Sequence, residues 1–425
     1  MQIIRYPERK DWDELLKRPS SDGSDLEKRV DKILKSVRKK GDKALNKLTK
    51  KFDGVELKNI QVSEQEIDEA VDGLPSELKD AIQLAAANIE TFHRFQVQQP
   101  EWIVTMPGIM CSRKSIPIER VGLYIPGGTA PLFSTVLMLG IPARLAKCKE
   151  IILCSPPGNE GKLHPAILFT AQLVGISKIF KVGGVQAIGA MAYGTETIPK
   201  VYKIFGPGNQ FVTHAKQMVQ KEGVAIDMPA GPSEVAVFAD GYADPSFVAA
   251  DLLSQAEHGS DSQVLLVSGD ELIVENVQFE IQKQLTELPR KEIAIRVLAN
   301  SKAIIIKDDQ EAMELLNEYA PEHLILACNN ADEMSEKVQN AGSVFLGHYS
   351  PESVGDYASG TNHTLPTNGF AKAYSGVSVD SFVKKITYQK LSKEGLEQIG
   401  KAVEIMAEAE GLHAHKNAVS IRLGR

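Results

Sequence analysis

The sequence has few cysteines, no long apolar run and no excess of positive charge. Its 425 residues include four cysteines and no Cys-x-x-Cys pair, which argues against a disulfide scaffold or a thiolate zinc site and favours a reducing compartment. The most apolar stretch, residues 132–143, is broken by Gly140 and Pro142 and cannot span a bilayer. The start, MQIIRYPERKDW, is too charged for a signal peptide. A formal net charge of −7 argues against nucleic-acid binding, so we expect a cytoplasmic protein without membrane or nucleic-acid partners.

Short apolar runs alternate with helical patterns from Arg120 onward. Each run has four or five residues, most are rich in Val and Ile, and Gly, Pro or Asp usually lies close by, which is typical of buried strands in a parallel sheet. Asp244-Pro245 predicts the start of one intervening helix, which we expect to stop at Gly259. The sequence therefore predicts an α/β fold with two domains. The predicted strands are residues 121–125, 151–154, 179–182, 201–205, 235–238, 264–267, 303–306, 324–327 and 343–346.

The two ends of the chain have helical patterns instead. Residues 26–51 and 76–96 are predicted helices, and the chain becomes helical again after Ser381, up to Gly411. Residues 35–51 are locally basic, but Val37, Ala44, Leu45 and Leu48 are spaced through them as on an amphipathic helix. We therefore expect those lysines on a solvated helix face.

The Gly-x-Gly-x-x-Gly fingerprint of dinucleotide-binding folds is absent. Three Gly-rich turns follow predicted strands instead, at residues 125–128, 183–186 and 206–209. Each places flexible backbone at the carboxyl end of a strand, where ligands of such sheets bind. Each alone could be an ordinary tight turn, but three together favour a ligand crevice.

Polar residues form several candidate constellations. Gln255 and His258, at i and i+3 on the last turn of the predicted helix, could meet one metal ion, although His258 could simply complement the helix dipole. Glu322 and His323 directly precede a strand and could activate water and act as general base. Both would have to leave regular strand geometry to act together, which Pro321 makes plausible; a surface Glu-His pair is the alternative.

Two further segments near the C-terminus carry ionisable residues. Residues 349–366 form a polar, Gly-containing segment with Asp356 and His363, which we interpret as a functional loop rather than a mobile surface excursion. Glu410, His413 and His415 follow the last helix. A frayed terminus is the simple explanation, but a carboxylate with two histidines suggests a tail that reaches a site, including one on a partner chain.

Several long strings together resemble the histidinol dehydrogenase family. The resemblance spans nearly the whole chain, so a chance match is excluded in practice. The strings are RVGLYIPGGTAPL (120–132), KVGGVQAIGAMAYGT (181–195), FGPGNQFV (205–212), DMPAGPSEV (227–235), ADLLSQAEHG (250–259), APEHL (320–324), SVGDYASGTNHTLPT (353–367) and EGLHAHKNAV (410–419).

The resemblance implies a zinc-dependent, NAD-linked four-electron oxidation of L-histidinol to L-histidine through bound L-histidinal. It implies one zinc ion per subunit, for which manganese is our second choice on ligand chemistry. Carried over residue by residue, it implies Glu322 and His323 as the acid–base pair. The implied zinc ligands are Gln255, His258, Asp356 and His415. The implied substrate contacts are Ser233, His363 and Glu410, together with His323 and the zinc ligands; the implied cofactor contacts are Tyr124, Gln186 and Asn209.

The family fold implies two incomplete Rossmann-like domains, similar to aldehyde dehydrogenases, with helical extensions at both ends. We expect a homodimer whose subunits exchange the C-terminal segment and share their sites. The expected parts are an N-terminal arm (1–24), a first α/β domain with most metal and catalytic residues (25–120 plus 235–380), a second, NAD-binding α/β domain (121–234), and a helical tail (381–425).

Three other functions are compatible with parts of the sequence. A cysteine-dependent aldehyde dehydrogenase would use Cys154, at a strand end, although a buried structural cysteine is the commoner case. A zinc hydrolase would use the metal and Glu322 without NAD. A non-catalytic ligand-binding module is the third.

Overall fold

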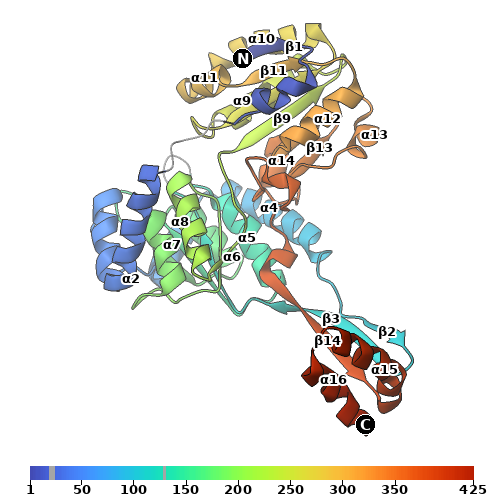
Figure 1. The fold of residues 1–425 in the computed structure, drawn as a ribbon. Coiled ribbons are helices and arrows are strands. Elements are labelled where there is room, and N and C mark those ends of the chain that lie inside the picture. Colours follow the sequence, from blue (N-terminus) through green and yellow to red (C-terminus); the bar gives the residue numbers. More distant parts are fainter. Residues whose placement is uncertain (19–23, 128–130) are drawn as a thin grey trace.

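The computed structural model describes residues 1–18, 24–127 and 131–425, which form two parallel-sheet units and a smaller projecting unit (Figure 1). All nine predicted strands occur, and the predicted α/β class is confirmed. Gly128 of the first Gly-rich turn lies outside the described residues. Within the described residues, every helix is too short or too polar to cross a membrane.

The first unit is a five-stranded parallel sheet in the order β6-β5-β4-β7-β8. Its central strands are buried on both faces and are followed by helices that cover the sheet. The strands are β4 (Arg120–Tyr124), β5 (Glu150–Ser155), β6 (Lys178–Lys181), β7 (Lys203–Phe205) and β8 (Ala225–Ile226); the helices are α5 (Phe133–Leu145), α6 (Pro165–Leu173), α7 (Gly184–Tyr193) and α8 (Gln210–Lys221).

The N-terminal helices pack onto this five-stranded unit, which differs from the predicted assignment of residues 25–120. Helix α2 (Ser24–Phe52) lies against α7 and α8, α3 (Glu64–Gly73) against α6, and α4 (Ser76–Arg94) against α5. Helices α2 and α7 pack closely at Gly189 of α7, where a side chain would press against Leu34 and Val37 of α2. An apolar stripe shows that a helix is buried on one face, not which sheet it covers.

The second unit is a six-stranded parallel sheet in the order β1-β11-β10-β9-β12-β13. Helix α9 starts after Asp244, whose carboxylate accepts a hydrogen bond from the Ser246 amide at 2.8 Å, as the sequence predicts. The strands are β1 (Gln2–Arg5), β9 (Glu234–Ala239), β10 (Gln263–Ser268), β11 (Lys302–Ile305), β12 (His323–Ala327) and β13 (Ser343–Leu346). The helices are η1 (Arg9–Asp11), α1 (Trp12–Leu15), α9 (Pro245–Ala256), α10 (Glu271–Leu285), α11 (Lys291–Ala299), α12 (Asp309–Tyr319), α13 (Ala331–Ser335) and α14 (Glu352–Tyr357).

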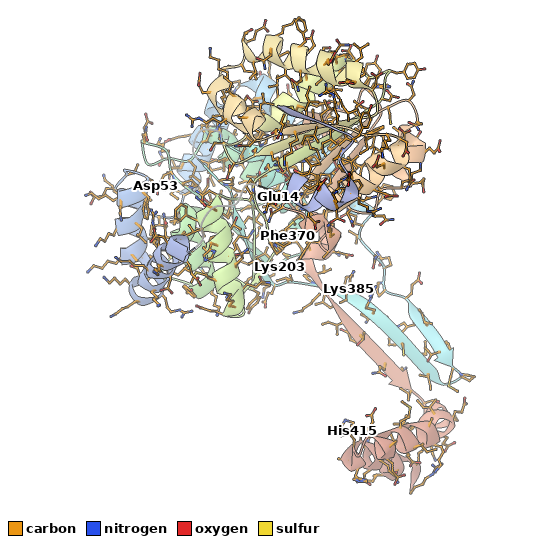
Figure 2. All side chains as sticks on the ribbon, turned by 45° about the horizontal axis from the view of Figure 1, so that its top comes forward. Glu14, Asp53, Lys203, Phe370, Lys385 and His415 are labelled. Atoms are coloured by element: carbon orange, nitrogen blue, oxygen red, sulfur yellow. The ribbon has the colours of Figure 1, made fainter. Side chains whose placement is uncertain are left out.

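The third unit projects from the other two and ends in the C-terminal helices (Figures 1 and 2). The prediction that the chain is helical from residue 381 is wrong for residues 383–391, which form strand β14. Its backbone is satisfied by antiparallel pairing with β3 from far earlier in the chain, a contact that local pattern cannot reveal. The elements of the third unit are β2 (Trp102–Met106), β3 (Ile109–Pro117), β14 (Val383–Leu391), α15 (Lys393–Ala409), α16 (His413–Ser420) and η4 (Ile421–Leu423). The short helices η2 (Phe370–Lys372) and η3 (Val379–Phe382) belong to the body of the protein, where Lys372 pairs with Glu318 and Phe382 stacks on Phe205.

A buried ion pair holds the Gly-rich turn that follows β7. Lys216 of α8 pairs with Asp227, and both side chains are almost completely buried. The Lys216 ammonium also donates to the Gly206 carbonyl at 2.9 Å, while the Asp227 carboxylate accepts from the Gly206 amide at 2.8 Å. Gly206 has φ +125°, and a Cβ there would overlap the Tyr124 carbonyl. The ion pair therefore fixes a backbone conformation open only to glycine.

We expect Lys216→Met to lower the free energy of unfolding by about 3–5 kcal/mol, because the Asp227 carboxylate would stay buried without its partner. Urea denaturation measures the change. Lys221→Met, at the exposed end of the same helix, is the matched control and should change stability by about 0.5 kcal/mol or less. Equal stability of the two variants would contradict the structural role of the pair.

Candidate active site

The predicted acid–base pair lies at the amino-terminal edge of the six-stranded sheet. Both side chains are buried, and the Glu322 Oε2 lies 3.8 Å from the His323 Nδ1. Ala320 has a left-handed backbone, φ +51°, and Pro321 follows it. The backbone is thus irregular before the strand, as the sequence analysis required, and neighbouring residues place their side chains together.

The strand β9 supports this pair from the side. The Glu322 carboxylate accepts a hydrogen bond from the backbone amide of Glu234 at 3.0 Å, and the His323 Nδ1 lies 3.4 Å from the Glu234 carbonyl oxygen. Glu234 is itself held by Arg18, which also donates to the Tyr319 carbonyl at 2.6 Å. Arg18 therefore joins the two backbone segments that carry the pair. Ser233, a predicted substrate contact, directly precedes β9.

Three carboxylates surround the His323 ring. Besides Glu322, the Glu352 Oε1 lies 3.7 Å from Nδ1 and the Asp356 Oδ1 lies 3.5 Å from Nε2. Burial alone lowers the pKa of His323, but these charges outweigh it and raise the pKa to about 10. Burial raises the pKa of Glu322 and of Glu352 to about 8. Burial also opposes the charged form of Asp356, yet hydrogen bonding to His323 holds that pKa below its usual value.

The same cluster has the donors that a divalent cation needs. Ligand atoms of His258, Glu352 and Asp356 all lie within 4.8 Å of one another. Gln255, one turn before His258, is fully buried, and neither atom of its amide finds a hydrogen-bond partner among the described residues. A buried amide without partners is costly unless something else binds it. Nitrogen and oxygen donors of this kind fit zinc or manganese.

Glu352 was missed by the sequence analysis. Residues 349–366 were interpreted as a loop, but residues 352–357 form the short helix α14. Glu352 and Asp356 are four residues apart, so both lie on the face of α14 that meets His323. That spacing is the sequence signal that could have identified Glu352.

His363 connects the cluster to the five-stranded unit. Its Nδ1 lies 2.8 Å from the backbone oxygen of Asp356, and its Nε2 lies 3.1 Å from the hydroxyl of Thr135 on α5. Burial lowers the pKa of His363 and favours the neutral ring. The predicted substrate contact therefore lies where the two sheets meet.

Two predicted site residues lie elsewhere in this chain. Glu410 and His415 belong to the projecting unit, and Figure 2 shows His415 at its tip, well away from the body of the protein. Within one chain, the structure thus brings together His258 and Asp356, with Gln255 one helical turn before His258, but it does not bring His415 to them.

The three predicted cofactor residues line one cleft of about 1460 Å³. Tyr124 ends β4, Gln186 lies in the first turn of α7, and Asn209 precedes α8. The Tyr124 hydroxyl accepts a hydrogen bond from the Gly184 amide at 3.1 Å. The cleft opens at the carboxyl ends of the parallel strands, the usual ligand site of such sheets. Its volume exceeds the roughly 300–1,000 Å³ of a drug-sized pocket, so an extended ligand would fit.

The alternative nucleophile is poorly placed for catalysis. The Cys154 side chain is completely buried within β5, and burial raises the pKa of its thiol. A reactive cysteine needs a lowered pKa and access to its substrate. The geometry argues against thioester chemistry at Cys154.

Comparisons with known proteins agree over nearly the whole chain. The family model described as histidinol dehydrogenase matches residues 16–423. The chain is 60% identical to a histidinol dehydrogenase of Bacteroides fragilis strain YCH46, covering 100% of this chain and 99% of that protein. It is 54% identical to one of Mannheimia succiniciproducens, covering 96% of each.

A solved structure extends the agreement to the fold. The crystal structure of histidinol dehydrogenase from Elizabethkingia anophelis matches with a TM-score of 0.98 and 56% identity, covering 100% of this chain and 98% of that chain. These matches show that the chain belongs to the histidinol dehydrogenase family, the oxidoreductases that oxidise histidinol in histidine biosynthesis.

Proposed function

We propose that this protein converts L-histidinol to L-histidine in two successive NAD-linked oxidations at a zinc site shared by two subunits. The observation that carries the proposal is the convergence of His258 and Asp356 beside His323. The unpartnered amide of Gln255 lies one helical turn before His258. This cluster lies at the amino edge of one sheet, and His363 bridges it to α5 of the unit whose carboxyl edge holds the cleft. The bound substrate would thus lie between a metal and a cofactor.

We assign zinc to Gln255, His258, Asp356 and a partner copy of His415. When bound, zinc would hold the substrate imidazole and amine, while NAD in the cleft of Tyr124, Gln186 and Asn209 would accept hydride. Glu352, on the same helix face as Asp356, is a further candidate ligand or a partner of His323. A divalent cation beside Asp356 would also offset the negative charge that raises the pKa of His323, returning it toward neutrality.

The acid–base steps belong to the buried pair. His323 takes the hydroxyl proton of histidinol in the first oxidation, which gives the bound aldehyde. As water adds to the aldehyde carbon, Glu322 takes a proton from the water and protonated His323 returns its proton to the carbonyl oxygen, which gives the hydrate. His323, neutral again, takes a hydroxyl proton of the hydrate in the second oxidation, while the second hydride would pass to a second NAD. Each role is worth roughly 10²–10⁴ in rate. Because both side chains are buried, the site would keep the bound aldehyde from escaping between the two oxidations.

The stoichiometry tests the activity directly. Purified protein supplied with zinc, NAD and histidinol should form two NADH per histidinol consumed, measured by absorbance and by amino-acid analysis of histidine. Removing the metal with a chelator should abolish both oxidations, and added zinc should restore them. Histidinol-independent ester or amide hydrolysis with no NADH would favour the zinc hydrolase instead.

Glu322→Gln should separate the two oxidations. The amide cannot accept a proton from water, so aldehyde formation should continue while acid formation falls by about 10²–10⁴. Single-turnover assays started from histidinol and from histidinal measure the two steps. Equal losses in both would assign Glu322 to substrate binding instead.

We further propose a homodimer in which the projecting unit supplies His415 and Glu410 to the neighbouring subunit. Support comes from the position of His415 in Figure 2 and from the unpartnered amide of Gln255 in the cluster. The projecting unit also exposes apolar side chains on several of its elements: Trp102, Ile103, Val104, Ile405, Met406 and Ile421. Exposed apolar surface of this kind is typical of a protein interface.

Mixing two inactive variants tests this exchange. His415→Ala and His323→Ala should together regain about a quarter of wild-type activity after subunit exchange, because half the dimers are mixed and each has one intact site. Each variant alone is the control. No recovery despite mixed dimers detected by mass spectrometry would place the site within one chain.

We also propose a cytoplasmic location. The four cysteines are free thiols, as expected in a reducing compartment.

A further inference from the structure

A row of basic side chains on α2 lines the large cleft. The sequence analysis predicted that the lysines of residues 35–51 lie on a solvated helix face. Those in the row are exposed, as are Arg29 and Lys32, and all of them line the cleft. The acidic residues of the lining are fewer, namely Asp53 and Glu160. The basic row consists of Arg29, Lys32, Lys40, Lys43, Lys47 and Lys51.

The middle of this row has no opposite charge to neutralise it. Among the described residues, no carboxylate forms an ion pair with Lys40, Lys43 or Lys47. Two lysines of α2 outside the cleft lining do have such partners, since Lys35 pairs with Asp31 at 2.7 Å and Lys50 with Glu56 at 2.6 Å. In a chain of net charge −7, a cleft wall with excess positive charge attracts an anionic ligand.

Two of the helix ends around the cleft, those of α6 and α8, offer few free amides to such a ligand, whereas α7 begins at Gly184 without a side-chain cap. In dinucleotide-binding folds, free amides at a helix N-terminus normally hold the diphosphate. Here the Asn209 side chain accepts hydrogen bonds from the first amides of α8, at 3.1 and 3.2 Å. The first free amide of α6 donates to the His164 ring at 3.2 Å. Two helix ends are thus capped by their own side chains, in a chain that lacks the Gly-x-Gly-x-x-Gly fingerprint.

We propose that Lys40, Lys43 and Lys47 hold the diphosphate of the dinucleotide whose nicotinamide end reaches Tyr124, Gln186 and Asn209. The proposal rests on the NAD-linked function above and names the residues that replace the missing fingerprint. Lysine suits this role because its ammonium is a flexible point charge that needs no fixed fork geometry. Lys43 and Lys47, one helical turn apart, present two such charges on one side of α2.

The test compares two double variants of the full-length protein with the same change in charge. Lys43→Glu/Lys47→Glu reverses the charge of the cleft wall. Lys28→Glu/Lys39→Glu reverses two exposed lysines of α2 that precede its kink at Gly41 and do not line the cleft. The measurements are the KM for NAD, the KM for histidinol, and the affinity of ADP-ribose by calorimetry. ADP-ribose carries the diphosphate and adenosine without the nicotinamide.

We expect the cleft variant to raise the KM for NAD and the Kd for ADP-ribose about tenfold or more, with the KM for histidinol and the thermal stability unchanged. The control variant should change each value by about twofold or less. Added salt should weaken ADP-ribose binding to the wild type more than to the cleft variant. An unchanged Kd in the cleft variant, or equal losses in both variants, would overturn the proposal. Wild-type protein that binds ADP-ribose through the row but forms no NADH would instead refute the proposed function alone.

Discussion

The buried imidazole of His323 among three carboxylates is the constraint on which the rest of the structure depends. A protein interior does not tolerate several like charges in one place without a positive charge to balance them. Protonated His323 supplies one such charge, and the donors of His258, Glu352 and Asp356 converge where a bound cation would supply more. The fold carries this electrostatic cost at the cluster where the proposed metal and the proposed base would act on the same substrate.

The candidate site lies between two sheets, at the carboxyl ends of the strands of one sheet and the amino ends of the strands of the other. Parallel strands normally bind ligands at their carboxyl ends, and the cleft of the five-stranded unit lies at those ends. The six-stranded unit instead contributes the amino ends of β9 and β12, together with the end of α9. His363 and Thr135 join the two units at 3.1 Å. A site between the ends of two sheets would allow the substrate to bind to one unit and the cofactor to bind to the other.

The polar groups behind the site set its geometry before any ligand enters. Arg18 holds Glu234, whose backbone contacts both Glu322 and His323. On the other side, Lys216 and Asp227 hold the turn at Gly206, three residues before Asn209. Each device is a buried ion pair whose side chains also bind backbone groups, an arrangement that limits movement of the residues carried by that backbone. The two ion pairs therefore limit the movement of the backbone on both sides of the candidate site.

The sequence by itself determined nine of the eleven strands of the two parallel sheets, the start of α9 and the neighbouring positions of Glu322 and His323. These depend on local periodicity, capping and covalent order, which a single segment carries. Only the tertiary structure decided that α2–α4 cover the five-stranded sheet, that β14 is a strand, that Glu352 faces His323, and that the lysines of α2 line the cleft. The reason is that contacts between residues tens to hundreds of positions apart depend on which faces pack together, and a local pattern reports that a face is buried without naming what buries it.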